Sequence, residues 1–274
     1  MRTVTLPSGH VVPVLGQGTW HLGEEPRRRA DELAALRLGI ELGMTLIDTA
    51  EMYLGAEDLV REAIAGQRDR CFVIDKVVPN HATRSGTIAA CEASLRRLDT
   101  EWIDLYLLHW RGAVELEPTL EAFAELMATG KIRAWGVSNF DVADLLDLVG
   151  LTDQVPATDE VLYNLAHRGI EWDLVPWCRR RGIPVIAYSP FEEGTLLRHP
   201  ALRAVAARHA ATPAQIALAW VLRHPDVITI PKASSRAHVR ENHAALELHL
   251  TPEDLAELDR AFAPPRRKVP LDVL

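Results

Sequence analysis

The sequence predicts an α/β barrel in which eight parallel strands, each followed by a helix, close on themselves. Short apolar runs alternate with segments of helical periodicity, and this alternation is typical of parallel strands joined by helical crossovers. The chain has 274 residues, and a (β/α)8 barrel, or TIM barrel, takes about 250. No linker or internal repeat divides the sequence, so residues 1–274 are predicted to form a single domain.

Eight segments have the nearly continuous apolar character of strands that are covered on both faces. The predicted strands are Leu15–Gly18, Thr45–Asp48, Phe72–Lys76, Trp102–His109, Ile132–Val137, Thr158–Leu162, Pro184–Tyr188 and Val227–Ile230. An open, doubly wound sheet is the alternative, and it would carry the motif G-x-G-x-x-G after its first strand. Gly16 and Gly18 begin that pattern, but the third glycine position holds His21, which favours the barrel.

Between the predicted strands, apolar residues recur at the three- and four-residue spacing of amphipathic helices. Residues predicted to share a buried helix face are Leu33, Leu36 and Ile40; Ile88, Cys91, Leu95 and Leu98; and Leu120, Phe123 and Met127. Gly43 and Gly130 stand where a helix is expected to end, because a glycine is favoured just past the C-terminus of a helix.

Three segments lie outside the repeating pattern. Residues 4–12 predict an N-terminal hairpin under the barrel floor, with a turn at Pro7-Ser8-Gly9. Residues 251–262 predict an extra C-terminal helix with Thr251 as its N-cap. The Pro-rich and basic residues 264–274 predict a tail on the surface.

Composition and charge limit the cellular compartments and the binding partners that can be expected. The formal net charge of −8 disfavours nucleic acid and anionic membranes as partners. No apolar run approaches the 18 or so residues of a membrane span, and the first ten residues lack the apolar core of a signal peptide. Cys71, Cys91 and Cys178 are widely spaced, as expected of free thiols in a reducing compartment. These features predict a cytoplasmic protein.

Four chemically active side chains stand at predicted strand ends, where barrel enzymes have their active sites. Asp48 ends the second strand, Lys76 the third and His109 the fourth, and Tyr53 lies in the loop after Asp48. An ammonium near a phenol lowers the phenol's pKa from about 10, and a carboxylate behind the lysine keeps the lysine charged. The histidine can hydrogen-bond a carbonyl oxygen. This set therefore predicts a general acid that protonates a carbonyl oxygen while hydride reaches the carbon.

Each of the four residues also has a simpler interpretation. A strand-end aspartate often caps the next helix, a lone buried histidine is often structural, and a lone lysine is usually solvated. Their occurrence together at neighbouring strand ends favours the catalytic interpretation. No serine or cysteine nucleophile stands at a strand end, and no His/Asp/Glu cluster has the spacing of metal ligands. No metal is therefore expected.

Five motifs make the sequence similar to the aldo-keto reductase superfamily. They are residues 47–53 (IDTAEMY), 105–110 (LYLLHW), 136–140 (GVSNF), 187–190 (AYSP) and 230–233 (IPKA). Their order and spacing agree from Leu15 to Asn242, so the resemblance covers nearly the whole chain. Residues 50–53, residues 91–98 and the ending near Leu271 and Asp272 most resemble bacterial members described as methylglyoxal or diketogluconate reductases.

The resemblance implies a role for each matching position. Tyr53 would be the proton donor, Lys76 its activator, Asp48 the partner of the lysine and His109 the group that orients the carbonyl. The positions implied to hold NADPH are Gly18, Thr19, Ser138, Asn139, Glu160, Tyr188, Ser189, Lys232, Ser234, Arg236 and Asn242. Within this set, Tyr188 would stack on the nicotinamide ring. Trp20 and Trp110 would wall the substrate site.

Two positions depart from the family pattern. Many members have Asn-Gln at the end of strand six, where the glutamine contacts the nicotinamide carboxamide; this chain has Asp159-Glu160. An ionised Glu160 could only accept hydrogen bonds, and its charge would favour the positive ring of the oxidised cofactor. The alternative is that Glu160 turns away or is protonated, and that Asn139 alone holds the carboxamide. Many members also have an arginine six residues after the lysine that matches Lys232; this chain has His238, for which Arg236 could substitute. We expect NADPH as the cofactor, with NADH possible.

Taken together, the residues and the resemblance predict an oxidoreductase that reduces small aldehydes, dicarbonyls or keto-sugars with NADPH. The expected partner is a small carbonyl substrate, and the family resemblance implies a monomer. One alternative is a regulatory barrel that binds the cofactor with little turnover, as potassium-channel β-subunits of this superfamily are thought to do. A metal-dependent barrel hydrolase is a third interpretation, which the lack of metal-ligand spacing disfavours.

Overall fold

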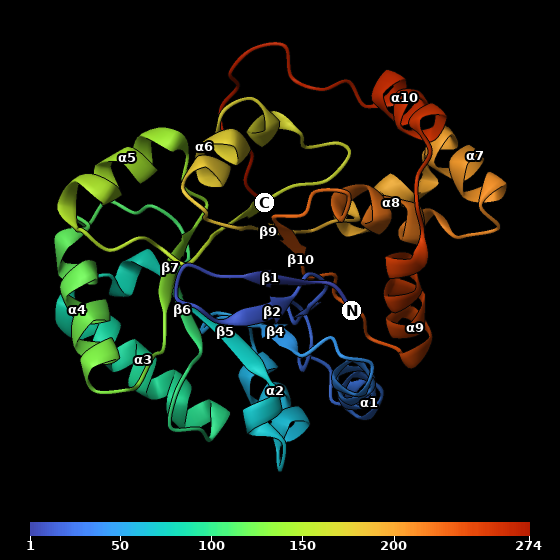
Figure 1. Ribbon diagram of the computed structural model, residues 1–274. Coiled ribbons are helices and arrows are strands. Elements are labelled where there is room, and N and C mark those ends of the chain that lie inside the picture. Colours follow the sequence, from blue (N-terminus) through green and yellow to red (C-terminus); the bar gives the residue numbers. More distant parts are fainter.

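The computed structural model describes residues 1–274, and a barrel of eight parallel strands forms its centre (Figure 1). In chain order the strands are β3 (Gln17–Gly18), β4 (Leu46–Asp48), β5 (Phe72–Val77), β6 (Leu105–Leu108), β7 (Trp135–Ser138), β8 (Asp159–Leu162), β9 (Val185–Tyr188) and β10 (Val227–Thr229). Backbone bridges from Leu15 to Thr229 and from Gly18 to Lys232 join the first strand to the last. The predicted barrel is therefore confirmed, and the open sheet is not formed.

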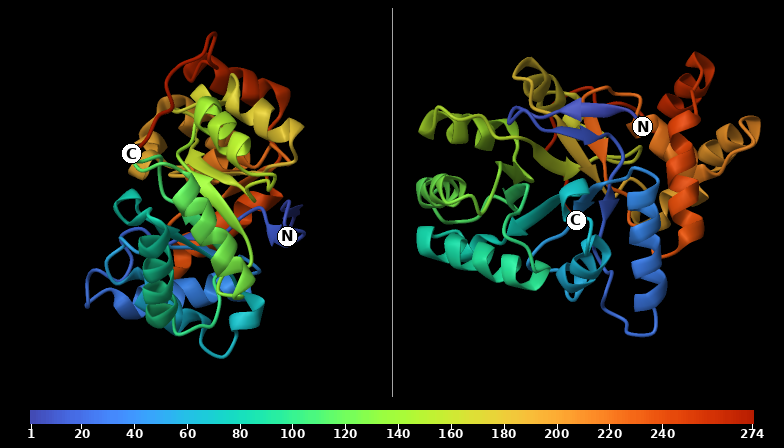
Figure 2. Two further views of the ribbon diagram at one scale, coloured as in Figure 1. Left: turned by 90° about the vertical axis from the view of Figure 1, so that its left-hand side faces the viewer. Right: turned by 60° about the horizontal axis from the view of Figure 1, so that its bottom comes forward.

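Helices surround the strands (Figure 2). They are α1 (Arg29–Glu41), α2 (Ala56–Ile64), α3 (Arg84–Leu98), α4 (Glu117–Ala128), α5 (Val142–Leu151), α6 (Leu174–Arg180), α7 (Pro200–Arg208), α8 (Pro213–Val221), α9 (Arg236–Ala244) and α10 (Pro252–Ala261). Short 3₁₀ turns are η1 (Arg68–Arg70), η2 (Pro79–His81), η3 (Gly169–Glu171), η4 (Glu192–Gly194), η5 (Leu196–Arg198) and η6 (Ala245–Glu247). No helix is both long enough and apolar enough to span a membrane.

Two apolar clusters hold the helices and strands together. The larger has 49 buried residues and joins strand side chains such as Ile47 and Val73 to the inner faces of the helices. The smaller has 23 buried residues and includes Leu46 and Ile74, which point the other way along the same strands, into the barrel. This alternation follows from the two-residue side-chain period of a strand.

The predicted helix ends are confirmed, and one predicted helix face needs a correction. Gly43 and Gly130 have φ values of +90° and +74°, which only glycine adopts without strain. In α4, however, Met127 is 36% exposed while its neighbour Leu126 is 1% exposed. Placing Met127 in the core was wrong, because the buried face of α4 continues from Phe123 to Leu126 and leaves Met127 outside.

The two additions to the barrel form as predicted. The strands β1 (Thr3–Thr5) and β2 (Val11–Pro13) pair antiparallel across one end of the barrel (Figure 1). Val4 and Val12 from this hairpin belong to the interior cluster, so the hairpin closes the barrel floor. Thr251 caps α10 through a reciprocal capping box with Asp254, which satisfies the free N–H groups of the first turn.

The C-terminal tail departs from the prediction. Most of residues 264–274 are exposed, as expected of a surface tail. Its last two residues, Val273 and Leu274, instead line the central cavity. The tail therefore crosses the surface and ends at the mouth of the barrel, on the face opposite the hairpin.

Gly18 provides a test of how the barrel closes. A Cβ at this position would lie 2.6 Å from the carbonyl oxygen of Ile230, which is backbone and cannot rotate away. We expect Gly18→Ala to lower the free energy of unfolding by about 1–3 kcal/mol in urea titrations, because overpacking forces the two strands apart. The control is Gly150→Ala in α5, where nothing lies within 4 Å. Equal stability of both variants would contradict the close approach at this seam.

Candidate active site

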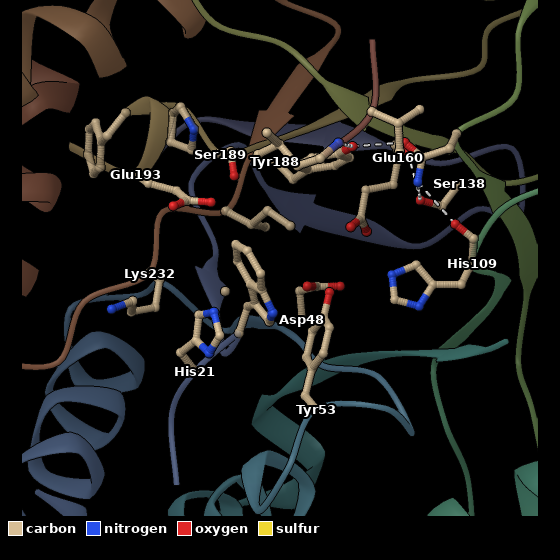
Figure 3. Close-up of a pocket in the computed structure, with 18 of the residues that line it drawn as sticks. His21, Asp48, Tyr53, His109, Ser138, Glu160, Tyr188, Ser189, Glu193 and Lys232 are labelled. Atoms are coloured by element: carbon tan, nitrogen blue, oxygen red, sulfur yellow. Dashed lines mark hydrogen bonds between the residues drawn. The ribbon is translucent and has the colours of Figure 1, made fainter. Parts of the chain in front are cut away.

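A cavity of about 710 Å³ opens at the carboxyl ends of the barrel strands (Figure 3). Its wall brings together twelve of the residues predicted from sequence: Gly18, Trp20, Asp48, Tyr53, His109, Trp110, Ser138, Asn139, Glu160, Tyr188, Ser189 and Lys232. Its other lining residues, which the sequence analysis missed, are His21, Met52, Pro190, Phe191, Glu193, Gly194, Ile230, Val273 and Leu274. The predicted residues that do not line it are Thr19, Lys76, Ser234, Arg236 and Asn242.

The strand period decides which side chains reach the cavity. Lys76 on β5 and Glu160 on β8 directly follow Asp75 and Asp159, whose side chains point outward from the barrel. Asp159 Oδ1, for example, accepts a hydrogen bond from the backbone N–H of Phe140 at 3.4 Å. Consecutive strand residues point to opposite faces, so the inward set comprises Lys76 and Glu160, with Asp48 at the end of β4.

Lys76 is fully buried, and its ammonium has three oxygen partners. It donates to Asp48 Oδ1, to the backbone oxygen of Thr49 at 3.1 Å, and lies 3.2 Å from Glu160 Oε1. Burial disfavours the charged form, but the carboxylates of Asp48 and Glu160 outweigh it, so the pKa of Lys76 is raised. The lysine is therefore a fixed cation directly behind the cavity.

Tyr53 lies over Lys76, with the ammonium 5.3 Å from the centre of the phenol ring. Burial raises the pKa of Tyr53, and the ammonium acts against this rise while Asp48 and Glu160 add to it. The effect of the lysine predicted from sequence is present, but the predicted net lowering of the pKa was wrong because burial is the larger effect. At neutral pH Tyr53 therefore holds its proton, as a general acid must before reaction.

His109 directly follows β6, and its ring lies next to that of Tyr53. Its ring centre lies 5.8 Å from that of Tyr53 and 5.1 Å from that of Trp110. Burial, with a smaller effect from the charge on Lys76, lowers the pKa of His109 to about 3. The imidazole is therefore neutral, so it can orient a carbonyl oxygen through its N–H group but cannot act as the acid at neutral pH.

Asn139 links the ends of three strands at the cavity wall. Its Nδ2 donates to the backbone oxygen of His109 at 3.1 Å and to Ser138 Oγ at 3.2 Å, and its Oδ1 accepts from Tyr188 Oη at 2.9 Å. Ser138 Oγ donates in turn to the backbone oxygen of Glu160 at 2.8 Å. Asn139 has a φ of +58°, which asparagine tolerates better than most residues.

Several predicted cofactor residues lie outside this group. Thr19 is fully buried, and its Oγ1 donates to the backbone oxygen of Asp48 at 2.8 Å, so it supports the wall from behind. Asn242 is also buried, on α9. Arg236 faces a second, smaller cavity between α1 and α9. Of the cofactor residues predicted after β10, only Lys232 lines the main cavity.

The tail and the loop after β9 are joined at the rim by His167. Its Nδ1 lies 2.9 Å from Asp272 Oδ2 and its Nε2 lies 3.0 Å from Glu192 Oε1. Asn164 holds the same loop by donating to Glu192 Oε2 at 2.8 Å and to the backbone oxygen of Ser189 at 2.9 Å. These contacts place Val273 and Leu274 over the cavity, and no local sequence pattern indicated them.

A closed barrel whose strand ends bring a phenol, a buried ammonium, a carboxylate and a neutral imidazole to one cavity defines a class of carbonyl-reducing enzymes. A model of the aldo/keto reductase family matches residues 14–263. Methylglyoxal reductase YeaE of Escherichia coli is 50% identical over 97% of this chain and 97% of its own length. Glyoxal reductase of Bacillus subtilis is 34% identical over 94% of this chain and 91% of its own.

A solved structure agrees with these relatives. The aldo-keto reductase from Klebsiella pneumoniae in complex with NADPH is 49% identical, covers 100% of this chain and 99% of its own, and superposes with a TM-score of 0.97. The chain belongs to the aldo/keto reductase family and is an oxidoreductase. The family predicted from the sequence motifs is confirmed, and the comparisons give no support to the alternative of a regulatory barrel.

The two histidines at the rim and the base of the cavity give a pH prediction. His109 should remain neutral from about pH 5 to about 8, because that range lies above its lowered pKa. His167 should instead titrate above the ordinary range: burial opposes its charged form, but the carboxylates of Asp272 and Glu192 outweigh burial and raise its pKa. NMR titration of the imidazole signals measures both. A His109 signal that titrates near neutrality would contradict the burial of this ring.

Proposed function

We propose that the protein reduces small α-dicarbonyl compounds, such as methylglyoxal, to hydroxycarbonyl products with NADPH as the hydride donor. The observation that carries the proposal is the placement of Tyr53, Lys76, Asp48 and His109 around one end of the cavity. The names of the two relatives, methylglyoxal reductase and glyoxal reductase, support the dicarbonyl class. Small aldehydes and keto-sugars are the next substrates to compare.

The four residues divide the chemistry among them. Tyr53 donates its proton to the carbonyl oxygen, and the ammonium of Lys76 stabilises the phenolate that this step creates. Asp48 keeps the buried ammonium charged and fixes its direction. His109, being neutral, donates a hydrogen bond that orients the carbonyl oxygen toward Tyr53. Trp20 and Trp110, both partly exposed at the rim, form the apolar wall against which a small substrate packs.

The cavity also fits the cofactor, which supplies the hydride when bound. It is large enough for an extended molecule, with amide and hydroxyl groups at one end and the ammonium of Lys232 on its wall. Residues proposed to line the cofactor are Gly18, Ser138, Asn139, Glu160, Tyr188, Ser189 and Lys232. Residues proposed to complete the site from outside the cavity wall are Thr19, Ser234, Arg236 and Asn242.

We further infer that residues 1–274 act as one domain, as a monomer and in the cytoplasm. The three cysteines are buried and unpaired, which suits a reducing compartment. All groups of the proposed site come from one chain, so the site needs no second copy. The net charge of −8 gives no electrostatic attraction to nucleic acid.

The proposed activity is tested by the oxidation of NADPH in the presence of methylglyoxal, glyoxal, small aldehydes, keto-sugars and aromatic ketones. We expect the highest kcat/KM with the α-dicarbonyls. Tyr53→Phe should lower kcat by orders of magnitude and leave the Kd for NADPH nearly unchanged, because the phenol acts in the transition state. Absence of turnover with the whole panel would refute the proposed function, and a Tyr53→Phe variant with half the wild-type kcat would remove Tyr53 as the acid.

Lys232 tests the cofactor preference. We expect NADPH to bind about tenfold or more tightly than NADH, because one charge-assisted contact to a phosphate contributes about 1.5–3 kcal/mol. Lys232→Met should bring the two Kd values close together. The control is Lys131→Met, which removes the same charge from a surface lysine that pairs with Glu92. Titration curves that are equal for the two cofactors in the wild type would contradict the assignment.

A further inference from the structure

Glu160 is a second carboxyl group on the buried lysine of the active site. Its side chain is 3% exposed, and its Oε1 lies 3.2 Å from Lys76 Nζ. Its Oε2 is buried and has no hydrogen-bond partner. Figure 3 shows the carboxyl group pointing into the cavity, toward Asp48. A glutamine in this place would have the same shape, but it could not carry or release a proton.

The charges around Glu160 favour a protonated carboxyl group. The groups that face it are the ammonium of Lys76 from β5, the carboxyl of Asp48 from β4, the phenols of Tyr53 and Tyr188, and the neutral ring of His109. One ammonium can balance only one of two buried carboxylates, and an unbalanced buried charge is costly. Burial, followed by the carboxylate of Asp48, raises the pKa of Glu160 well above its ordinary range.

The proton resides on Glu160 rather than on Asp48 because of their hydrogen bonds. Asp48 accepts a direct hydrogen bond from the ammonium, which stabilises its charged form. Glu160 Oε2 has no donor beside it, so a negative charge on Glu160 is stabilised less, through the ammonium 3.2 Å from Oε1. Of the two forms considered from the sequence, the ionised Glu160 is therefore the less stable one while Lys76 is the only cation in the group.

We propose that Glu160 stores the proton that restores Tyr53 after each reduction, and that Lys76 transfers it. The proposal rests on the proposed carbonyl reduction. Lys76 lies between the two ends of this path: its ammonium is 5.3 Å from the centre of the Tyr53 ring and 3.2 Å from Glu160 Oε1. Lys76 is fully buried. The proton on the neighbouring Glu160 therefore reaches its amine more directly than a proton from water does.

The step balances in atoms and charge. Hydride forms the new C–H bond of the substrate as the C–H bond that held it on the reduced nicotinamide breaks, and the phenolic O–H bond of Tyr53 breaks as its proton joins the carbonyl oxygen. The phenolate takes a proton from the ammonium of Lys76, and the resulting amine takes the proton of Glu160, whose O–H bond breaks. Tyr53 and Lys76 are then restored, and Glu160 is a carboxylate. Its negative charge faces the positive charge that an oxidised nicotinamide ring carries.

This assignment predicts that binding of the oxidised cofactor releases a proton. A positive ring in the cavity favours the ionised form of Glu160, so NADP+ should drive its proton off, whereas NADPH has a neutral ring and should not. By linkage, NADP+ binding must then tighten as pH rises, by up to about tenfold per pH unit for one proton. The 2′-phosphate is common to both cofactors, so its own titration cancels when the two are compared.

The experiment is calorimetric titration of the protein with NADP+ and with NADPH at pH 7 in two buffers of different ionisation enthalpy. For the wild type we expect the release of about one proton when NADP+ binds and of almost none when NADPH binds. Glu160→Gln should release none with either cofactor. The matched control is Asp159→Asn, which removes the neighbouring buried carboxyl group, whose side chain contacts Phe140 instead of Lys76. It should release a proton as the wild type does.

The outcomes separate this inference from the proposed function. Tyr53→Phe, which should be inactive, should still release a proton on binding NADP+, because Glu160 and Lys76 are unchanged. Absence of release in the wild type, or equal release by Glu160→Gln, would overturn the role of Glu160 even if the enzyme reduces methylglyoxal rapidly. The wild-type measurement decides the matter by itself if the Glu160 variant does not fold.

Discussion

The buried ammonium of Lys76 is the interaction on which the rest of the site depends. It donates hydrogen bonds to oxygens of Asp48 and Thr49 and lies 3.2 Å from Glu160 Oε1, so its partners come from two other strand ends of the barrel. A buried charge is tolerated only when it is paired and hydrogen-bonded. The ends of β4, β5 and β8 must therefore keep their relative positions, and Tyr53, which follows β4, is held over the lysine as a result.

The barrel makes this convergence possible because its strands are parallel and closed. Parallel strands end on the same side, so inward-pointing residues from non-neighbouring strands meet above the barrel interior. The cluster of 23 apolar residues fills the space beneath them, and the hairpin of β1 and β2 seals the other end. Water is thus excluded from below Lys76, which strengthens the electrostatic interactions among the groups that face the cavity.

Much of this arrangement was predictable, because it depends on local patterns. Asp48, Lys76 and His109 were identified by their places at the ends of apolar runs, and the strand period explains their direction. Met127 was misassigned because an apolar neighbour, Leu126, occupies the buried position. Val273 and Leu274 reach the cavity through contacts such as that between His167 and Asp272, 105 positions apart in sequence, which no local pattern encodes. Ionisation states were least predictable, since burial reversed the expectation for Tyr53.

The charges of the active-site groups must stay balanced during carbonyl reduction. Carbonyl reduction consumes a proton and leaves a positive ring beside the site, so a group of fixed charge would be unbalanced either before the reaction or after it. Two carboxyl groups that share one ammonium titrate as a unit and can absorb that change. Asp48 compensates Lys76 throughout, and Glu160 is free to ionise when a second positive charge arrives. Glu160 therefore gives this active site a charge that can follow the oxidation state of its cofactor.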